Sequence, residues 1–424
     1  MDPTGQVAHR FPLVARSRPP CTALSARIAA LAALADRAAH DGDRTAASRV
    51  HNQAALIASD SQHPDLARTW CHRHAHAYLD HQESSDATTG RLALEPLVNV
   101  ARLHIRAGAG DAAAALLNDL YQAVRTRTDT VIDGIPVPMA SLTSTAEHHR
   151  SLLQWLWSVN LADGTRARTT AGRWDDAETH LRHHNGIGRR MLDGRQVAVI
   201  AHATRHEHAN ATRILAETEP GDASEAAVTA CLTALNRPAG HPLPAEHRET
   251  LIDRYRHLPP DASLIVFRTR LALSIIDAIA EPNHPTVQGT AGELIRAVVE
   301  AADGYAARDI LAHRACAASA TAEQTRQLTT ILNRSGLRGY LPESSLNELQ
   351  AAVETSEGVI VRCTRTGRVA AEPSRGLPAD AASASIDAAT SCTHTASPEV
   401  SGDAAGHRRR CVSRAPLPAR RTTR

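Results

Sequence analysis

Two pairs of histidines at helical spacing are the first residues in this chain that could do chemistry. His72 and His76 lie four residues apart, and so do His202 and His206. Side chains four residues apart share one face of a helix, so each pair could offer two imidazoles to a metal ion. No third ligand follows at a suitable spacing, and Glu207 does not stand where an HExxH site requires it. We therefore predict solvated helix faces here, with no metal and no cofactor.

A second candidate lies in residues 185–195, NGIGRRMLDGR, where glycines and arginines precede an expected helix. Backbone N–H groups at a helix start and guanidinium forks can hold a phosphate or a carboxylate. A dinucleotide site would need a preceding strand, which the pattern does not predict. The alternative is a flexible turn beside a solvated arginine face. The residues of this candidate anion site are Gly186, Gly188, Arg189, Arg190 and Arg195.

The absence of lysine excludes several classes of enzyme, since all 47 basic residues are arginine. A P-loop lysine, a Schiff-base lysine and the strand lysine of protein kinases are all impossible. Seven cysteines are scattered with no CxxC pair, which is typical of a reducing compartment rather than a disulfide framework or a zinc ribbon. The N-terminal residues lack the apolar run of a secretory signal, and residues 28–35 are too few to span a bilayer. We expect a cytoplasmic protein with no membrane partner.

The elements that must position these residues are mainly helices. With two Phe, five Tyr and four Trp, alanine and leucine must fill the core, which suits close helix packing. We predict an all-α fold, with a flexible N-terminus over residues 1–20, a helical array over 21–236 and a second helical group over 245–357. An Asp-Gly turn between β-forming residues predicts a small hairpin insertion at about 128–140.

The last part of the chain has a different composition. Residues 358–364, GVIVRCT, suggest one short strand. Residues 365–424 are rich in small residues and proline and hold ten arginines against five acidic residues, so we predict a disordered basic tail. Without interleaved aromatic residues or a folded reader motif, we do not expect this tail to bind nucleic acid.

A recurring turn motif indicates how the helices are joined. Residues 171–177, AGRWDDA, are followed by Leu181, and weaker copies begin at Ala107 and Ala203, while residues 65–67 with Cys71 keep only the second half. Glycine can end a helix in the left-handed conformation, an aspartate such as Asp175 can cap the next helix, and alanine lets two helices cross closely. The spacings of 64 and 32 residues are near one or two units of about 34 residues.

This motif resembles the joint of tetratricopeptide-like helical repeats, over about residues 45–220. The resemblance implies an α-solenoid, a superhelical stack of helix pairs with an extended concave surface; the alternative is an irregular all-α domain. It also implies that Asn52 and Asn99, each near the middle of a first helix, face the groove and bind a peptide, although Asn52 could equally be a capping or surface residue. Residues 51–60 and 161–166 resemble segments of actinobacterial proteins of the Streptomyces type.

These observations favour a non-catalytic scaffold that binds a protein or peptide, in a regulatory role or accessory to a biosynthetic cluster. One alternative is an effector-sensing regulator that binds a small anionic ligand near residues 189–195. Another is an enzyme whose site no motif reveals, since no GxSxG, SxxK or paired-carboxylate motif stands out. The sequence does not predict an oligomeric state.

Overall fold

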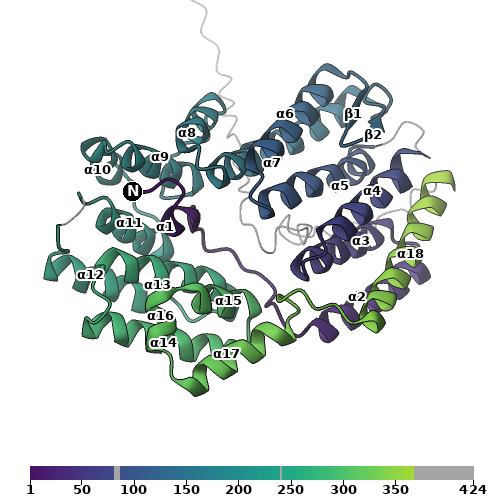
Figure 1. The fold of residues 1–424 in the computed structure, drawn as a ribbon. Coiled ribbons are helices and arrows are strands. Elements are labelled where there is room, and N and C mark those ends of the chain that lie inside the picture. Colours follow the sequence, from purple (N-terminus) through teal and green to yellow (C-terminus); the bar gives the residue numbers. More distant parts are fainter. Residues whose placement is uncertain (81–85, 239–240, 367–424) are drawn as a thin grey trace, which may run out of the picture. The chain divides into compact units, whose positions relative to one another are not determined.

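The computed structural model describes residues 1–80, 86–238 and 241–366 (Figure 1). These residues are mostly helical and include one two-stranded antiparallel sheet, which confirms the all-α prediction. Among them, no helix combines the length and the apolar character that crossing a membrane would require. The predicted basic tail lies outside the described residues from position 367 onward.

The first half of the described chain is made of helices that follow one another closely. They are α1 (Gln6–His9), α2 (Leu24–Asp41), α3 (Arg44–Asp60), α4 (Pro64–Leu79), α5 (Ala87–Arg106), α6 (Gly110–Thr126), α7 (Ala146–Thr170), α8 (Trp174–His183), α9 (Asp193–Thr204) and α10 (His208–Ala216). Between α6 and α7, strands β1 (Thr130–Ile132) and β2 (Ile135–Val137) form the predicted hairpin.

The second half continues with further helices. They are α11 (Ala223–Leu235), α12 (Ala245–Arg256), the 3-10 turn η1 (Ala262–Leu264), α13 (Ile265–Ile279), α14 (Pro285–Ala301), α15 (Gly304–Ala312), α16 (Arg314–Ser319), α17 (Ala322–Arg334) and α18 (Glu343–Thr366). The strand predicted at 358–364 is wrong, because those residues continue α18. Val359 and Ile360 are buried on the packed face of this helix, so tertiary packing overrides their β propensity.

The hairpin turns as its sequence requires. Asp133 and Gly134 have φ angles of 51° and 84°, the pair of positive values that a type I′ turn needs. Ile132 pairs with Ile135, and both are buried. The carboxylate of Asp133 accepts hydrogen bonds from Arg68 of α4, which holds the hairpin against that helix.

Six joints in the described residues share one local geometry. At each joint a residue with positive φ follows one helix, the next helix begins two residues later, and a fully buried alanine comes five residues after the positive φ. The left-handed residue reverses the chain, and the alanine of the first turn allows the two helices to cross closely. The left-handed residues are Gly42, Gln62, Gly108, Gly172, His206 and Ala302, and the alanines are Ala47, Ala67, Ala113, Ala177, Ala211 and Ala307.

Two details of the predicted motif need correction. In the copy that follows Ala203, the buried alanine is Ala211 and not Ala209, which is exposed. The true spacing from Ala177 is therefore 34 residues. Asp175 and the equivalent Asp111 do not cap their helices, because each already lies inside the first turn, where its carboxylate pairs with an arginine instead.

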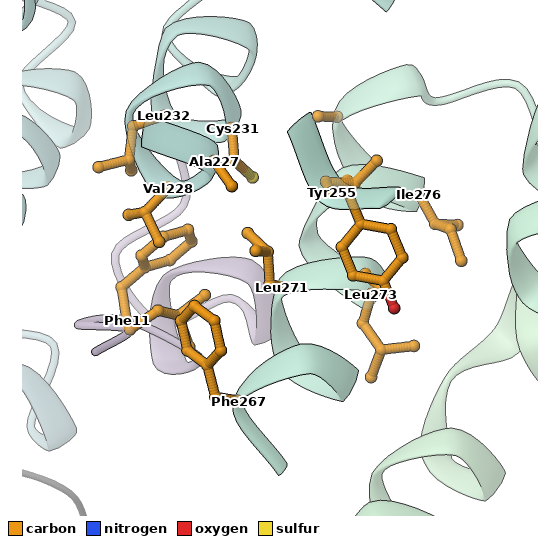
Figure 2. Packing of buried hydrophobic residues seen from close by; sticks show 14 of the residues in the cluster. Phe11, Ala227, Val228, Cys231, Leu232, Tyr255, Phe267, Leu271, Leu273 and Ile276 are labelled. Carbon is orange, nitrogen blue, oxygen red and sulfur yellow. The ribbon is translucent and has the colours of Figure 1, made fainter. Parts of the chain in front are cut away.

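Buried apolar side chains form three clusters. One joins residues from α8 to the end of α17 with residues of the N-terminal segment, and Figure 2 shows part of it. The other two join residues of α2 to α7 with residues of α18, which packs on α2, α3 and α4. The predicted helical array ends at residue 236 and the predicted second helical group begins at residue 245. The first cluster continues across this boundary, because α11 packs directly on α12 and α13.

The N-terminal residues, which we predicted to be flexible, pack against the second half of the chain. Phe11 and Leu13 are 2% and 4% exposed, within the first cluster. The side chain of Gln196 in α9 accepts from the backbone N–H of Leu13 and donates to its carbonyl oxygen, at 2.6 and 2.7 Å. Buried apolar side chains, the hydrogen bonds to Gln196 and the ion pair of Arg10 with Asp277 together hold this Pro/Arg-rich stretch in place.

Candidate functional site

The structure brings Asn52 and Asn99 together, but not in an open groove. They are 5% and 0% exposed, and the amide of Asn99 donates to the Oδ1 atom of Asn52 at 2.8 Å. Arg102 donates to the carbonyl oxygen of the Asn99 side chain and forms an ion pair with Asp163 at 2.9 Å. These side chains form one hydrogen-bonded cluster inside the packing of α3, α5 and α7, in which only the Oδ1 atom of Asp163 has no hydrogen-bond partner among the described residues. Peptide capture at the two asparagines therefore stays a prediction from the resemblance alone.

The arginines predicted to hold an anion are engaged within the chain. Arg189 forms an ion pair with Glu219 at 2.8 Å, and Arg190 forms one with Glu225. Arg195 is 7% exposed and donates to Thr218 and to the carbonyl oxygens of Gly188 and Ile214. These contacts hold segment 185–195 against α10, α11 and the loop between them.

Of the two glycines predicted to hold the anion, only Gly186 serves close packing. A Cβ atom on Gly186 would lie 2.8 Å from side-chain atoms of Leu161 and Leu181, whereas Gly188 has open space around it. At the start of α9, Asp193 already supplies a negative charge and forms an ion pair with Arg16 at 2.9 Å. An added anion would meet that carboxylate, so segment 185–195 is not the site that the structure favours.

Three of the four histidines in these pairs contact carboxylates rather than each other. His72 and Asp133 are 2.7 Å apart, His76 contacts Asp80, and His202 lies 2.5 Å from Glu207. Within the described ranges, no group of three or more His, Cys, Asp or Glu side chains is arranged to hold a metal ion.

A polar pocket between α6, α7 and α8 is the best candidate site in the described residues. Its volume is about 650 Å³, within the usual range for ligand sites. Its lining comes from α6, α7 and α8, together with Arg173 just before α8 and His184 just after it. The lining residues are Asn118, Tyr121, Gln122, Arg125, Asn160, Arg168, Arg173, Asp176, Thr179, His180, His183 and His184.

The charges around this pocket favour an anion. In the described part of the chain, neither Arg125 nor Arg168 forms an ion pair: Arg125 donates to Gln122, and Arg168 donates to the backbone oxygen of Gly164 at 2.7 Å. Burial lowers the pKa of Arg168, but an arginine stays protonated at neutral pH. The third arginine, Arg173, is already shared between Asp111 and Asp176.

The imidazoles of His180 in α8 and of His184, just after α8, also line the pocket. Burial, together with the nearby Arg168, lowers the pKa of His180 to about 4, and its Nε2–H donates to the backbone oxygen of Asn160. Burial and His183 also lower the pKa of His184, whose Nδ1 accepts from the indole N–H of Trp157 at 3.1 Å. The neutral ring of His184 then carries its proton on Nε2, as a further donor.

This pocket was missed by the sequence analysis. Positions 180, 183 and 184 share a helix face, which is a visible signal, but the two unpaired arginines come from α6 and α7. Only the packing of α6 and α8 on α7 places them around one space.

Comparison with protein-family models, with curated proteins and with solved structures finds no match for this chain. The structure shows an all-α protein with a pocket between α6, α7 and α8 that is lined by three arginines and one aspartate.

Proposed function

We propose that the protein is a non-catalytic, cytoplasmic binding scaffold of the tetratricopeptide-like kind, and that the pocket between α6, α7 and α8 takes an acidic peptide segment of a partner protein. The observation that carries the proposal is the pair of arginines, Arg125 and Arg168, that face the pocket without a carboxylate partner. Guanidinium groups bind carboxylates strongly, and partly desolvated ones do so more strongly than exposed ones.

The repeated joint supports the scaffold part of the proposal. The same joint, with its left-handed residue and its buried alanine, recurs between α2 and α15. Two consecutive joints, at Gly172 and His206, lie 34 residues apart. Stacked helix pairs of this length present extended surfaces for peptides and proteins. The lining supports a binding role, because no serine or cysteine nucleophile is among its residues and His180 is held by a backbone carbonyl.

A defined acidic peptide tests the proposal. We expect acetylated hexaglutamate to bind the full chain in isothermal titration, and the affinity to fall by at least about fivefold between 50 and 300 mM NaCl, because the contacts are ionic. Hexalysine is expected not to bind. The double variant Arg125→Gln, Arg168→Gln should lose at least about tenfold in affinity.

The matched control removes the same charge elsewhere. Arg37 and Arg296 are exposed and lie on other helices, so Arg37→Gln with Arg296→Gln should bind hexaglutamate like the wild type. Equal binding by the pocket variant and this control would contradict the proposal. If inorganic phosphate, but not the peptide, raises the melting temperature of the wild type and not of the pocket variant, a small anionic effector is the ligand instead.

A further inference from the structure

The N-terminal strap, defined as residues 10–16 (RFPLVAR), lies on the chain as a bound peptide would. Residues 11–23 have no helix or strand of their own, and the peptide bond between Phe11 and Pro12 is cis. It precedes α2 in sequence, yet it packs on α9, α11 and α13. The residues before the strap also contact the second half of the chain, because the indole N–H of Trp174 in α8 donates to the carbonyl oxygen of Pro3 at 2.9 Å.

Backbone recognition by a side-chain amide is the first element of the site. Gln196 is fully buried, and its amide satisfies both the N–H and the C=O of Leu13. A carboxamide can donate and accept at once, so it replaces the neighbouring strand that an extended peptide would otherwise need. Because it contacts only backbone, this pair does not depend on the identity of residue 13.

Apolar anchors and charges supply the specificity. Figure 2 shows the ring of Phe11 among Val228, Leu232 and Phe267, and all four side chains are nearly buried. At the two ends of the strap, Arg10 donates to Asp277 at 2.6 Å and Arg16 donates to Asp193 at 2.9 Å. The site thus has an aromatic pocket, a backbone clamp and two carboxylates.

We propose that this surface is a peptide-binding site, which the strap occupies when no partner is present. Its external ligand is an extended segment of a partner protein with an aromatic residue and an aliphatic residue between two arginines. The chemistry is opposite in charge to that of the pocket between α6, α7 and α8, so the two sites select different ligands. The strap competes with the partner and sets the threshold for binding.

The test uses the full chain and a fluorescein-labelled synthetic peptide of residues 6–18, followed by fluorescence anisotropy. In the variant Phe11→Ala, Leu13→Ala the strap is weakened, so we expect this chain to bind the peptide at least about tenfold more tightly than the wild type does. Adding Gln196→Ala should reduce that affinity at least about tenfold, and a peptide with Phe11→Ala should not bind. The control Val131→Ala, on the exposed face of β1, should leave binding unchanged. A folded strap variant that shows no saturable binding, or binding that Gln196→Ala does not affect, overturns the proposal.

A second measurement needs no variant. In hydrogen exchange on the wild-type chain, the amide of Leu13 should exchange at least about tenfold faster than the buried amides of α9, because the strap leaves its site without unfolding the helices. Exchange of both at the same slow rate would show that the strap is a permanent part of the core, and the proposal would fail.

Discussion

At the scale of single residues, Asp60 at the end of α3 is a point where several elements meet. Its carboxylate is fully buried and accepts hydrogen bonds from Arg27 of α2, Arg106 of α5 and the hydroxyl of Tyr305 in α15, at 2.7, 2.5 and 2.6 Å. A buried carboxylate is tolerated only when its charge is matched, and here two guanidinium groups match it.

Removing this carboxylate leaves two arginines without their partner. We expect Asp60→Ala to lower the free energy of unfolding by about 3–5 kcal/mol, measured by urea denaturation. Asp119→Ala, at an exposed position of α6, should change it by less than about 0.5 kcal/mol. A similar effect of the two substitutions would show that Asp60 is not the anchor that its contacts indicate.

The stacked pair His51 and His74 gives the protein a sensitivity to acid. Their rings are 4.7 Å apart and both residues are 1% exposed. Burial lowers the pKa of His51 to about 3, with Arg73 as a further cause, and burial and His51 lower the pKa of His74 well below its usual value. Both are therefore neutral in the folded protein, whereas they take up protons below about pH 6.5 when the chain unfolds.

The sign of the pH effect follows from this difference. Above about pH 6.5 both histidines are neutral whether the chain is folded or not, so the free energy of unfolding does not depend on them. As the pH falls from there toward the folded pKa values, only the unfolded chain takes up protons, and the free energy of unfolding decreases. Each histidine should contribute a slope of about 1.4 kcal/mol per pH unit between pH 6 and pH 4. Urea unfolding across this range should show a flatter profile for His51→Gln, His74→Gln than for the wild type. The exposed control His247→Gln should keep the wild-type slope, and an unchanged slope in the double variant would refute the account.

At the scale of elements, the joints show which parts of a local motif carry structural information. Glycine occupies only some of the left-handed positions, and Gln62, His206 and Ala302 occupy others. The buried alanine five residues later is present every time, because its small size is what the helix crossing requires.

Substitution of neighbouring alanines tests the register of the copy of the motif that begins at Ala203. Ala211 is fully buried and Ala209 is exposed on the same helix, α10. Ala211→Leu should reduce the free energy of unfolding by about 1–3 kcal/mol through overpacking, whereas Ala209→Leu should change it by less than about 0.5 kcal/mol. Thermal unfolding followed by circular dichroism distinguishes them, and the opposite order would restore the register that the sequence suggested.

At the scale of the described chain, its first segment packs on the second half and its last helix packs on the first half. The N-terminal segment packs with α8 to α17, and α18 packs on α2, α3 and α4. In a simple repeat array each pair contacts only its neighbours, so parts can unfold separately. Here long-range contacts link both halves, and we expect one cooperative transition.

A substitution in α18 tests this cooperativity. Leu349 is fully buried against the N-terminal helices, and Leu349→Ala should lower stability by about 2–5 kcal/mol. The test uses a background in which the other three tryptophans, Trp70, Trp155 and Trp157, are replaced by phenylalanine, so that Trp174 in α8 alone reports on the other half. Far-UV circular dichroism and the fluorescence of Trp174 should then shift together. The exposed Asn347→Ala is the control. Separate transitions for the two signals would mean that the halves unfold independently.

Much of the local structure could be predicted from the sequence alone. The alanine- and leucine-rich composition indicated a helical fold, and the Asp-Gly pair located the hairpin, because a hairpin turn depends on contacts within a few residues. The motif around Gly172 also predicted a left-handed glycine and a buried Ala177, and the structure has both, because these are local requirements of the turn. The run at 358–364 was ambiguous because β-branched residues also fit a helix when one face is buried.

Tertiary packing decided the rest. Asn52 and Asn99 were predicted to face a groove, but only the packing of α3 on α5 shows that they satisfy each other. Arg189, Arg190 and Arg195 resembled an anion site until their partners from α10, α11 and the loop between them were in place. Conversely, Arg125 and Arg168 became a candidate site because neither forms an ion pair with a carboxylate of the described residues. A charged side chain near a turn has the same local sequence whether it binds an internal partner or a ligand, so the distinction depends on residues far along the chain.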